Sequence, residues 1–236
     1  MKTIYHPADS RGFADHGWLK AKHSFSFAEY YDPGRMHFGK LRVLNDDIVA
    51  PGKGFGTHPH NNMEIITIPL RGQLEHKDSM GNGSVITPGE VQVMSAGSGI
   101  MHSEFNPSNS EEVNLFQIWI FPETQDVDPR YDQREFDPGK YENNILRLVN
   151  NETNGDTIFI HQKAAVSLSR LQAGVELTYE NNYDGNGTYV MLVNGKVSVG
   201  EQTLTHRDAL GIWDTDSFAF KAAEDSQLLF IEVPMN

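Results

Sequence analysis

Glycine and proline interrupt this chain so often that a long helix is not expected anywhere in it. The 236 residues include 21 glycines and 11 prolines, spread along the whole length. Both residues destabilise a helix interior, and both are common in turns. The segments between them are short and rich in Val, Ile, Phe and Tyr, which are typical of β-strands. The spacing predicts an all-β fold, a sandwich or a barrel, built from many short strands.

Several of these segments alternate apolar and polar residues, which is the period of a half-buried strand. One exception is 162–171 (QKAAVSLSRL), which is compatible with a short helical turn. The expected strands lie at 23–27, 41–49, 63–70, 91–96 and 113–120, and then at 175–179, 188–195, 196–200, 209–214, 218–222 and 228–233.

Charge and composition exclude several classes of function. The formal net charge is −13, which argues against direct binding of nucleic acid or of an anionic membrane through a general basic surface. No apolar run approaches the ~20 residues of a membrane helix, and the first residues do not resemble a signal peptide. There is no cysteine, so any metal must be held by histidine and carboxylate. We expect a cytoplasmic protein.

A polar segment with two prolines, 128–144, is interpreted as the passage between two halves. The halves resemble each other weakly, because Gly72 begins GQLEH after an expected strand and Gly195 begins GKVSV after another. This similarity favours a duplicated β-barrel with domains 1–130 and 131–236. A single large sandwich remains the alternative.

Histidines concentrate in the first 102 residues, and two pairs have the spacing of metal ligands. His58 and His60 lie in GFGTHPHNNMEI, and His102 and Glu104 lie in GIMHSEF. Side chains at i and i+2 of an extended segment leave the same face, so each pair can converge on one ion. Together they offer three imidazoles, which suit Fe, Ni, Cu or Zn, and one carboxylate.

Structural roles are the simpler interpretation for most other candidates. The remaining histidines are expected to be structural or solvent-facing, although His76 follows the Gly72 turn and could point inward. The aromatic segments 23–32 and 116–121 are expected in the core, although some of their side chains could line a pocket for a flat ligand.

The spacing of Gly52, His58, His60 and Glu64 resembles the first motif of the cupin superfamily, and the chain as a whole resembles the pirin family. The shared blocks appear in the expected order and cover most of the first 120 residues. They are DHGWL (15–19), FSFAEYYDP (25–33), LRVLNDD (41–47), GFGTHPHNNMEI (54–65), HKDSMGN (76–82) and VMSAGSGIMHSE (93–104).

The resemblance implies a bicupin: two tandem antiparallel β-barrels of the jelly-roll type. The N-terminal barrel would hold one divalent transition metal, with Fe(II) favoured and Ni, Cu, Mn or Zn as alternatives. Glu64 would lie beside the ligands rather than among them. The ligands implied by the motifs are His58, His60, His102 and Glu104.

The C-terminal barrel is expected to be metal-free, because the weak repeat places no convincing ligands there. The positions that correspond to the four ligands are Asn181, Tyr183, Phe220 and Ala222.

Two classes of function follow from the resemblance. The first is a quercetin 2,3-dioxygenase that opens the ring of a flavonol-like substrate with dioxygen and releases carbon monoxide, with Glu104 as the catalytic base. The natural substrate of such a site need not be a flavonol. The second is a metal- or redox-sensing regulatory protein that binds a transcription factor or another protein partner. A roomy apolar pocket at the metal would favour the enzyme, and a basic groove would favour the regulator.

Overall fold

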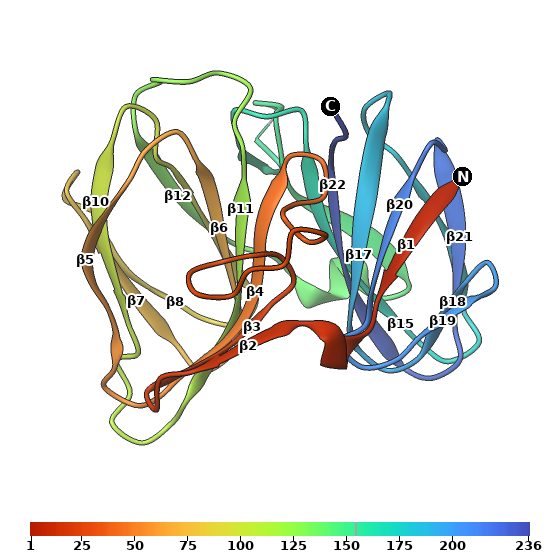
Figure 1. Ribbon diagram of the computed structural model, residues 1–236, viewed down its shortest axis with the longest axis horizontal. Helices are drawn as coiled ribbons and strands as arrows, with labels where there is room; N and C mark the ends of the chain where they lie inside the picture. The colour runs from red at the N-terminus through yellow and green to blue at the C-terminus, as the bar shows by residue number, and fades with distance from the viewer. Residues whose placement is uncertain (154) are drawn as a thin grey trace.

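Four β-layers lie side by side in the structure (Figure 1). The computed structural model describes residues 1–153 and 155–236. Within these ranges, two seven-stranded sheets form the middle layers, and a four-stranded sheet covers the outer face of each. The first middle sheet and its cover come mainly from the N-terminal half of the chain, and the second pair mainly from the C-terminal half.

In the N-terminal half, the middle sheet has the order β12-β9-β6-β11-β4-β3-β2 and the covering sheet the order β5-β10-β7-β8. Neighbouring strands in both sheets are antiparallel. The strands are β2 (Gly12–Asp15), β3 (Leu19–His23), β4 (Leu41–Val49), β5 (Gly54–His60), β6 (Glu64–Arg71), β7 (Leu74–Asp78), β8 (Gly83–Ile86), β9 (Glu90–Ser95), β10 (Ile100–Phe105), β11 (Val113–Ile120) and β12 (Arg130–Glu135).

In the C-terminal half, the middle sheet has the order β1-β20-β17-β22-β15-β13-β14 and the covering sheet the order β16-β21-β18-β19. Short 3-10 helices η1 (Ala8–Ser10) and η2 (Pro138–Tyr141) connect strands. The strands are β1 (Lys2–His6), β13 (Asn144–Asn150), β14 (Ile158–Phe159), β15 (Ala165–Leu171), β16 (Glu176–Glu180), β17 (Asn186–Asn194), β18 (Val197–Val199), β19 (Gln202–Leu204), β20 (Ala209–Trp213), β21 (Ser217–Ala222) and β22 (Ser226–Pro234).

Each half therefore consists of two facing sheets, as in a jelly roll, rather than one closed barrel. The expected all-β bicupin arrangement is confirmed, and the single large sandwich is wrong. The two glycines of the weak repeat occupy equivalent turns in the two halves. Gly72 and Gly195 both have positive φ, at 75° and 89°, in the turns β6–β7 and β17–β18 that lead from a middle sheet into its cover. A Cβ at position 72 would lie 2.6 Å from the carbonyl oxygen of Glu112, and a Cβ at position 195 would lie 2.4 Å from that of Asp225. Only glycine fits at either position.

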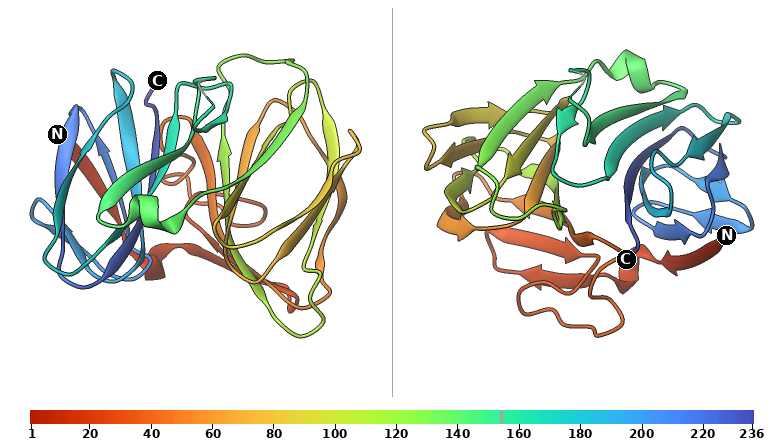
Figure 2. Two further views of the ribbon diagram at one scale, coloured as in Figure 1. Left: turned by 180° about the vertical axis from the view of Figure 1, so that it is seen from behind. Right: turned by 90° about the horizontal axis from the view of Figure 1, so that it is seen from above.

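The two halves exchange strands at their ends. β1 begins the chain but pairs with β20 in the C-terminal half, so its red ribbon lies among blue strands (Figure 2). β12 begins at Arg130, at the expected boundary, but pairs with β9 in the N-terminal half. The expected passage at 128–144 thus contains a strand of the first half as well as η2. The division of the chain into domains 1–130 and 131–236 stays a prediction, which we propose on the basis of the weak sequence repeat. The pairing of β1 and of β12 crosses this boundary.

A large apolar core lies between the two middle sheets and holds the halves together. Leu44, Ile66 and Phe116 from the first sheet pack in the same cluster as Tyr189 and Ile231 from the second, and all are buried. Successive side chains of a strand point to opposite faces. The alternate residues of β4, β6 and β11 therefore point away from this core, into the N-terminal half.

The interior of the C-terminal half is filled mainly by apolar side chains. Tyr179 stacks on Phe218 and Phe230, with ring centroids 5.5 and 4.8 Å apart, and Phe220 lies 5.2 Å from Phe230. All four side chains are buried. Among the residues that the structure describes, both groups of three or more potential metal ligands lie in the N-terminal half.

The expectation of a helical turn at 162–171 is wrong, because most of this segment forms β15. This strand lies between β13 and β22, and all of its residues except Arg170 are buried. Hydrogen bonding on both sides and burial on both faces outweigh the local helical preference of its alanines and leucines.

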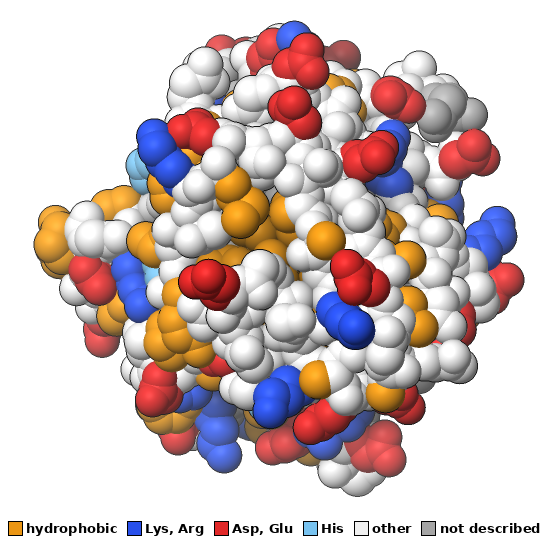
Figure 3. All heavy atoms as spheres, turned by 90° about the vertical axis from the view of Figure 1, so that its right-hand side faces the viewer, with side chains coloured by type: hydrophobic (Ala, Val, Ile, Leu, Met, Phe, Trp, Pro, Cys, Tyr) orange, Lys and Arg blue, Asp and Glu red, His pale blue; other side chains and the backbone are white. Residues whose placement is uncertain are grey.

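Charged side chains of both signs are interspersed on the face formed by the C-terminal half (Figure 3). The basic side chains on this face are separated by acidic and neutral ones rather than gathered in one patch. In residues 1–153 and 155–236, no helix has the length and apolar character needed to span a bilayer.

Candidate metal centre

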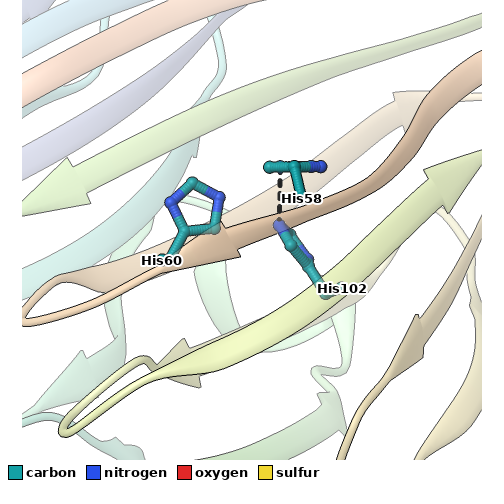
Figure 4. A group of neighbouring side chains, drawn as sticks. All are labelled: His58, His60 and His102. Atoms are coloured by element: carbon teal, nitrogen blue, oxygen red, sulfur yellow. Dashed lines mark hydrogen bonds between the residues drawn. The ribbon is translucent and has the colours of Figure 1, made fainter.

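Three histidines converge from two neighbouring strands of the N-terminal covering sheet (Figure 4). His58 and His60 are two residues apart on β5, and His102 on β10 lies directly opposite His58 in the antiparallel register. The three ring centroids are 4.4 to 4.9 Å apart. The Nε2 atoms of His58 and His102 are 3.0 Å apart.

The imidazoles fit a shared transition-metal ion. One ligand nitrogen from each ring lies within 4.8 Å of the others. Two imidazole nitrogens that bind one ion at about 2.1 Å are separated by about 3.0 to 3.4 Å, which matches the His58–His102 distance. Burial lowers the pKa of His60 to about 4 and that of His102 to about 3, with the neighbouring imidazoles adding to the effect. Neutral imidazoles offer lone pairs at neutral pH, as metal ligands must.

Glu104 lies beside the three histidines in the fully buried interior of the N-terminal half. One of its carboxylate oxygens is within 4.8 Å of ligand nitrogens of His76 and His102. The Gln117 side-chain amide donates to Glu104 Oε2 over 3.1 Å, and the Thr67 hydroxyl donates to Oε1 over 3.4 Å. Burial raises the pKa of Glu104 to about 7, and these two hydrogen bonds limit the increase. The role of Glu104 as a fourth ligand stays a prediction.

A β-bulge separates the two predicted ligand pairs. His102 pairs with His58, but Glu104 pairs with Phe55, so β5 has one extra residue across the same stretch of β10. Bulges re-aim side chains and are common beside active sites. The i, i+2 spacing in the sequence indicates the shared face of each pair but not this shift between the strands.

Gln117 and Thr67 are site residues that the sequence analysis missed. Together with Asn45 they form one row across the middle sheet, because Gln117 lies opposite both Asn45 on β4 and Thr67 on β6. The row faces the covering sheet and meets Glu104 there. A signal was present in the sequence, since Gln117 interrupts the apolar strand VNLFQIWI at a position that points inward.

A cavity of about 460 Å³ opens beside the histidines and Glu104. Its walls are mainly aromatic or apolar, and two pairs of rings pack edge to face: Trp18 with Phe55, and Phe27 with Trp119. Trp119 also packs against His60, with centroids 4.9 Å apart. Phe27 and Trp119 come from the two aromatic segments that the sequence analysis assigned mainly to the core. The residues lining the cavity are Trp18, Phe27, Asn45, Asp47, Gly54, Phe55, Gly56, His58, His60, Ile65, His102, Glu104, Gln117 and Trp119.

His76 points into the N-terminal half, which is one of the two orientations that the sequence allowed. Its side chain is fully buried, its ring stacks on that of Tyr131, and its centroid lies 5.3 Å from that of His102. His76 Nε2 is 3.3 Å from the carboxylate of Asp78, which is itself buried. His76 thus lies outside the group of His58, His60 and His102, but one of its ring nitrogens is within 4.8 Å of ligand atoms of His102 and Glu104.

Glu64 lies on the opposite face of its strand from the cavity. Ile65 lines the cavity, so the side chain of Glu64 points toward the C-terminal half. There its carboxylate accepts a hydrogen bond of 2.6 Å from the Ser95 hydroxyl and one from the backbone N–H of His161. The expected place of Glu64 beside the ligands is wrong, because the strand period directs it to the junction between the halves.

Stability should depend on pH through Glu64. Burial raises its pKa from 4.5 to about 7, so the folded protein binds this proton more tightly than the unfolded chain. The stability contributed by this proton is complete below about pH 4.5 and is lost as the pH rises to about 7. As the pH rises from 4.5 to 8, the free energy of unfolding of Glu64→Gln should therefore increase relative to that of the wild type, by at most about 3 kcal/mol.

Urea unfolding of the wild type and of Glu64→Gln at pH 4.5 and at pH 8 measures this difference. Glu135→Gln, at an exposed position on β12, is the control and should show no such trend. An equal effect of Glu64→Gln at both pH values would show that Glu64 is ionised throughout.

Facing antiparallel sheets with a group of three histidines that could hold a metal ion are typical of the cupin class of metal-binding β-proteins. Two family models match it: "Pirin" over residues 6–120 and "Quercetinase C-terminal cupin domain" over residues 148–233. The chain belongs to the pirin family, which confirms the resemblance seen in its motifs.

Related proteins match almost the full length of this chain. The chain is 41% identical to quercetin 2,3-dioxygenase of Escherichia coli K12, over 96% of each chain. It is 42% identical to a pirin-like protein of Caulobacter vibrioides, over 96% of this chain and 97% of the relative.

Solved structures agree with the fold. YhhW from E. coli is 39% identical and superimposes with a TM-score of 0.95, covering 100% of this chain and 99% of YhhW. A structure of YhhW in complex with nickel(II) has a TM-score of 0.94 at 38% identity, with all of both chains covered. A member of this family thus binds a transition metal.

Proposed function

We propose that this protein is a metal-dependent dioxygenase that opens the central ring of flavonols such as quercetin and releases carbon monoxide. The observation that carries the proposal is the convergence of His58, His60 and His102 at the wall of a largely aromatic cavity. Related chains named quercetin 2,3-dioxygenase support it. Flat aromatic substrates stack well on aromatic side chains, so the cavity suits a flavonol.

We propose that His58, His60, His102 and Glu104 hold one Fe(II) ion. Imidazole and carboxylate ligands also suit other divalent ions, and the nickel(II) complex of YhhW is an example from a relative. A divalent ion at this position would acidify the 3-hydroxyl of a bound flavonol and make the substrate reactive toward dioxygen.

The protein's own side chains prepare the substrate. Trp18, Phe27 and Trp119 hold the flat ring system and keep bulk water from it. Glu104 would alternate between binding the ion and accepting the proton of the 3-hydroxyl, because its carboxylate lies within reach of His102 at the wall of the cavity. Gln117 and Thr67 fix the orientation of this carboxylate. Dioxygen then adds to the resulting enolate, and both of its oxygen atoms enter the ring-opened product as carbon monoxide leaves.

The regulatory alternative has less support. A roomy apolar pocket is expected of an enzyme, and the cavity beside the histidines has this character. A regulator that signals only through the oxidation state of its metal has no need for an aromatic cavity of about 460 Å³.

Carbon monoxide release from quercetin in air tests the proposal. We expect iron-loaded protein to release carbon monoxide over many turnovers, and metal-free protein to release none. Loss of flavonol colour is an insufficient measure, because quercetin also oxidises unaided. Absence of carbon monoxide with iron, nickel, copper and manganese alike would reject flavonol dioxygenase activity and leave a regulatory role or another substrate.

A further inference from the structure

One carboxyl group in the cavity has no task in the proposed reaction. Asp47 lies on β4, where it shares the inward face with Asn45, and both line the cavity. Asp47 is only 5% exposed, and its Oδ1 is fully buried without a hydrogen bond. Buried polar atoms without partners are rare in folded proteins, and each one calls for an explanation.

The cations near β4 are on the other side of the sheet. Asp46 points away from the cavity, and there it pairs with Arg11 over 3.5 Å and with Arg207 over 3.0 Å. The cross-strand neighbours of Asp47 are Ala21 and Leu115, which offer no polar side chain. In the described parts of the chain, no ion pair joins a cation to Asp47, and this residue forms part of the cavity wall.

Asn45 adds a second polar group at the same edge of the cavity. Its side-chain oxygen lies 2.9 Å from Nδ1 of the buried His23, which holds the amide in place. The amide NH2 group is a donor, whereas the carboxyl group of Asp47 is an acceptor in either protonation state. This edge therefore presents an acceptor and a donor together, which is the pattern that an aromatic hydroxyl group needs.

We propose that Asp47, assisted by Asn45, binds a ring hydroxyl group of the substrate and so makes the cavity select polyhydroxylated aromatic substrates over unsubstituted ones. This inference rests on the proposed function, since it names a second recognition point for the same substrate. A site built to hydrogen-bond a hydroxyl group rejects an analogue that lacks it, because the buried partner then stays unpaired.

Anaerobic binding measures this preference without turnover. Trp18 and Trp119 line the cavity, so their fluorescence should be quenched by a flavonol that enters it. Quercetin is compared with 3-hydroxyflavone, which keeps the 3-hydroxyl group but lacks the other ring hydroxyls. We expect the metal-loaded wild type to bind quercetin about 10-fold or more tightly than 3-hydroxyflavone, as one hydrogen bond to a buried carboxyl group allows.

Variants at Asp47 then assign the preference to this residue. Asp47→Leu, which is apolar, should bind the two flavonols about equally, and Asp47→Asn, which keeps an acceptor oxygen, should retain part of the preference. Asp47→Ala is a second truncation in case leucine disturbs folding. Asp9→Leu, at an exposed position, is the control and should bind like the wild type.

Three results would overturn the inference: no preference in the wild type, an unchanged preference in Asp47→Leu, or loss of metal from Asp47→Leu, which would make Asp47 part of the metal site. These results differ from a failure of the proposed function. In that case the wild type itself binds no flavonol or releases no carbon monoxide.

Discussion

Replacing His58 by alanine is expected to release the metal while leaving the fold intact. His58 supplies one of the three converging nitrogens, and its Nε2 lies 3.0 Å from that of His102. Substitutions in the surroundings of metal ligands typically weaken metal affinity 10- to 100-fold, so loss of a ligand itself should cost more than about 100-fold. The half-buried side chain lies at the cavity wall, and its removal leaves the apolar cores untouched.

Metal content after dialysis, measured by elemental analysis, checks this result, and circular dichroism checks the fold. His16→Ala is the matched control, because His16 is exposed and outside the histidine group. It should keep the metal of the wild type. Full metal occupancy in His58→Ala would remove His58 from the ligand set.

Replacing Glu104 by glutamine is expected to abolish most turnover while some metal remains. Glutamine has nearly the same shape, and the three imidazoles are still present, but an amide cannot accept the substrate proton. General base catalysis contributes about 10²- to 10⁴-fold, so kcat should fall by that factor. Carbon monoxide release from quercetin measures the loss, and metal analysis of the same samples separates it from loss of the ion.

Glu111→Gln is the control for this substitution, because Glu111 is exposed and is not among the residues that line the cavity. It should turn over quercetin as the wild type does. Undiminished turnover by Glu104→Gln at equal metal content would exclude Glu104 as the base. If the variant instead lost all of its metal, Glu104 would be required to hold the ion, and its role in proton transfer would need a separate test.

Much of the fold could be predicted because its signals are local. Strand alternation and turn residues depend only on near neighbours in the chain, so the all-β class and the turns at Gly72 and Gly195 were accessible. The segment 162–171 was not, because its strand form depends on pairing with β13 and β22. The places of β1 and β12 were hidden for the same reason, since each strand pairs across the boundary between the halves.

The sequence alone determined which side chains are available for chemistry. The absence of cysteine restricts any metal to histidine and carboxylate, and the spacing of His58 and His60 puts two imidazoles on one face of a strand. These properties follow from composition and from the two-residue period of an extended chain. They hold before any long-range contact forms.

Only the tertiary structure decided what surrounds those side chains. Registers between distant strands bring His102 to His58, place Gln117 and Thr67 on Glu104, and turn Glu64 away from the cavity. The same registers put Asp47 inside and Asp46 outside, in contact with Arg11 and Arg207. A one-residue shift in a strand exchanges its two faces, and the register is set by the packing of whole sheets rather than by any short segment.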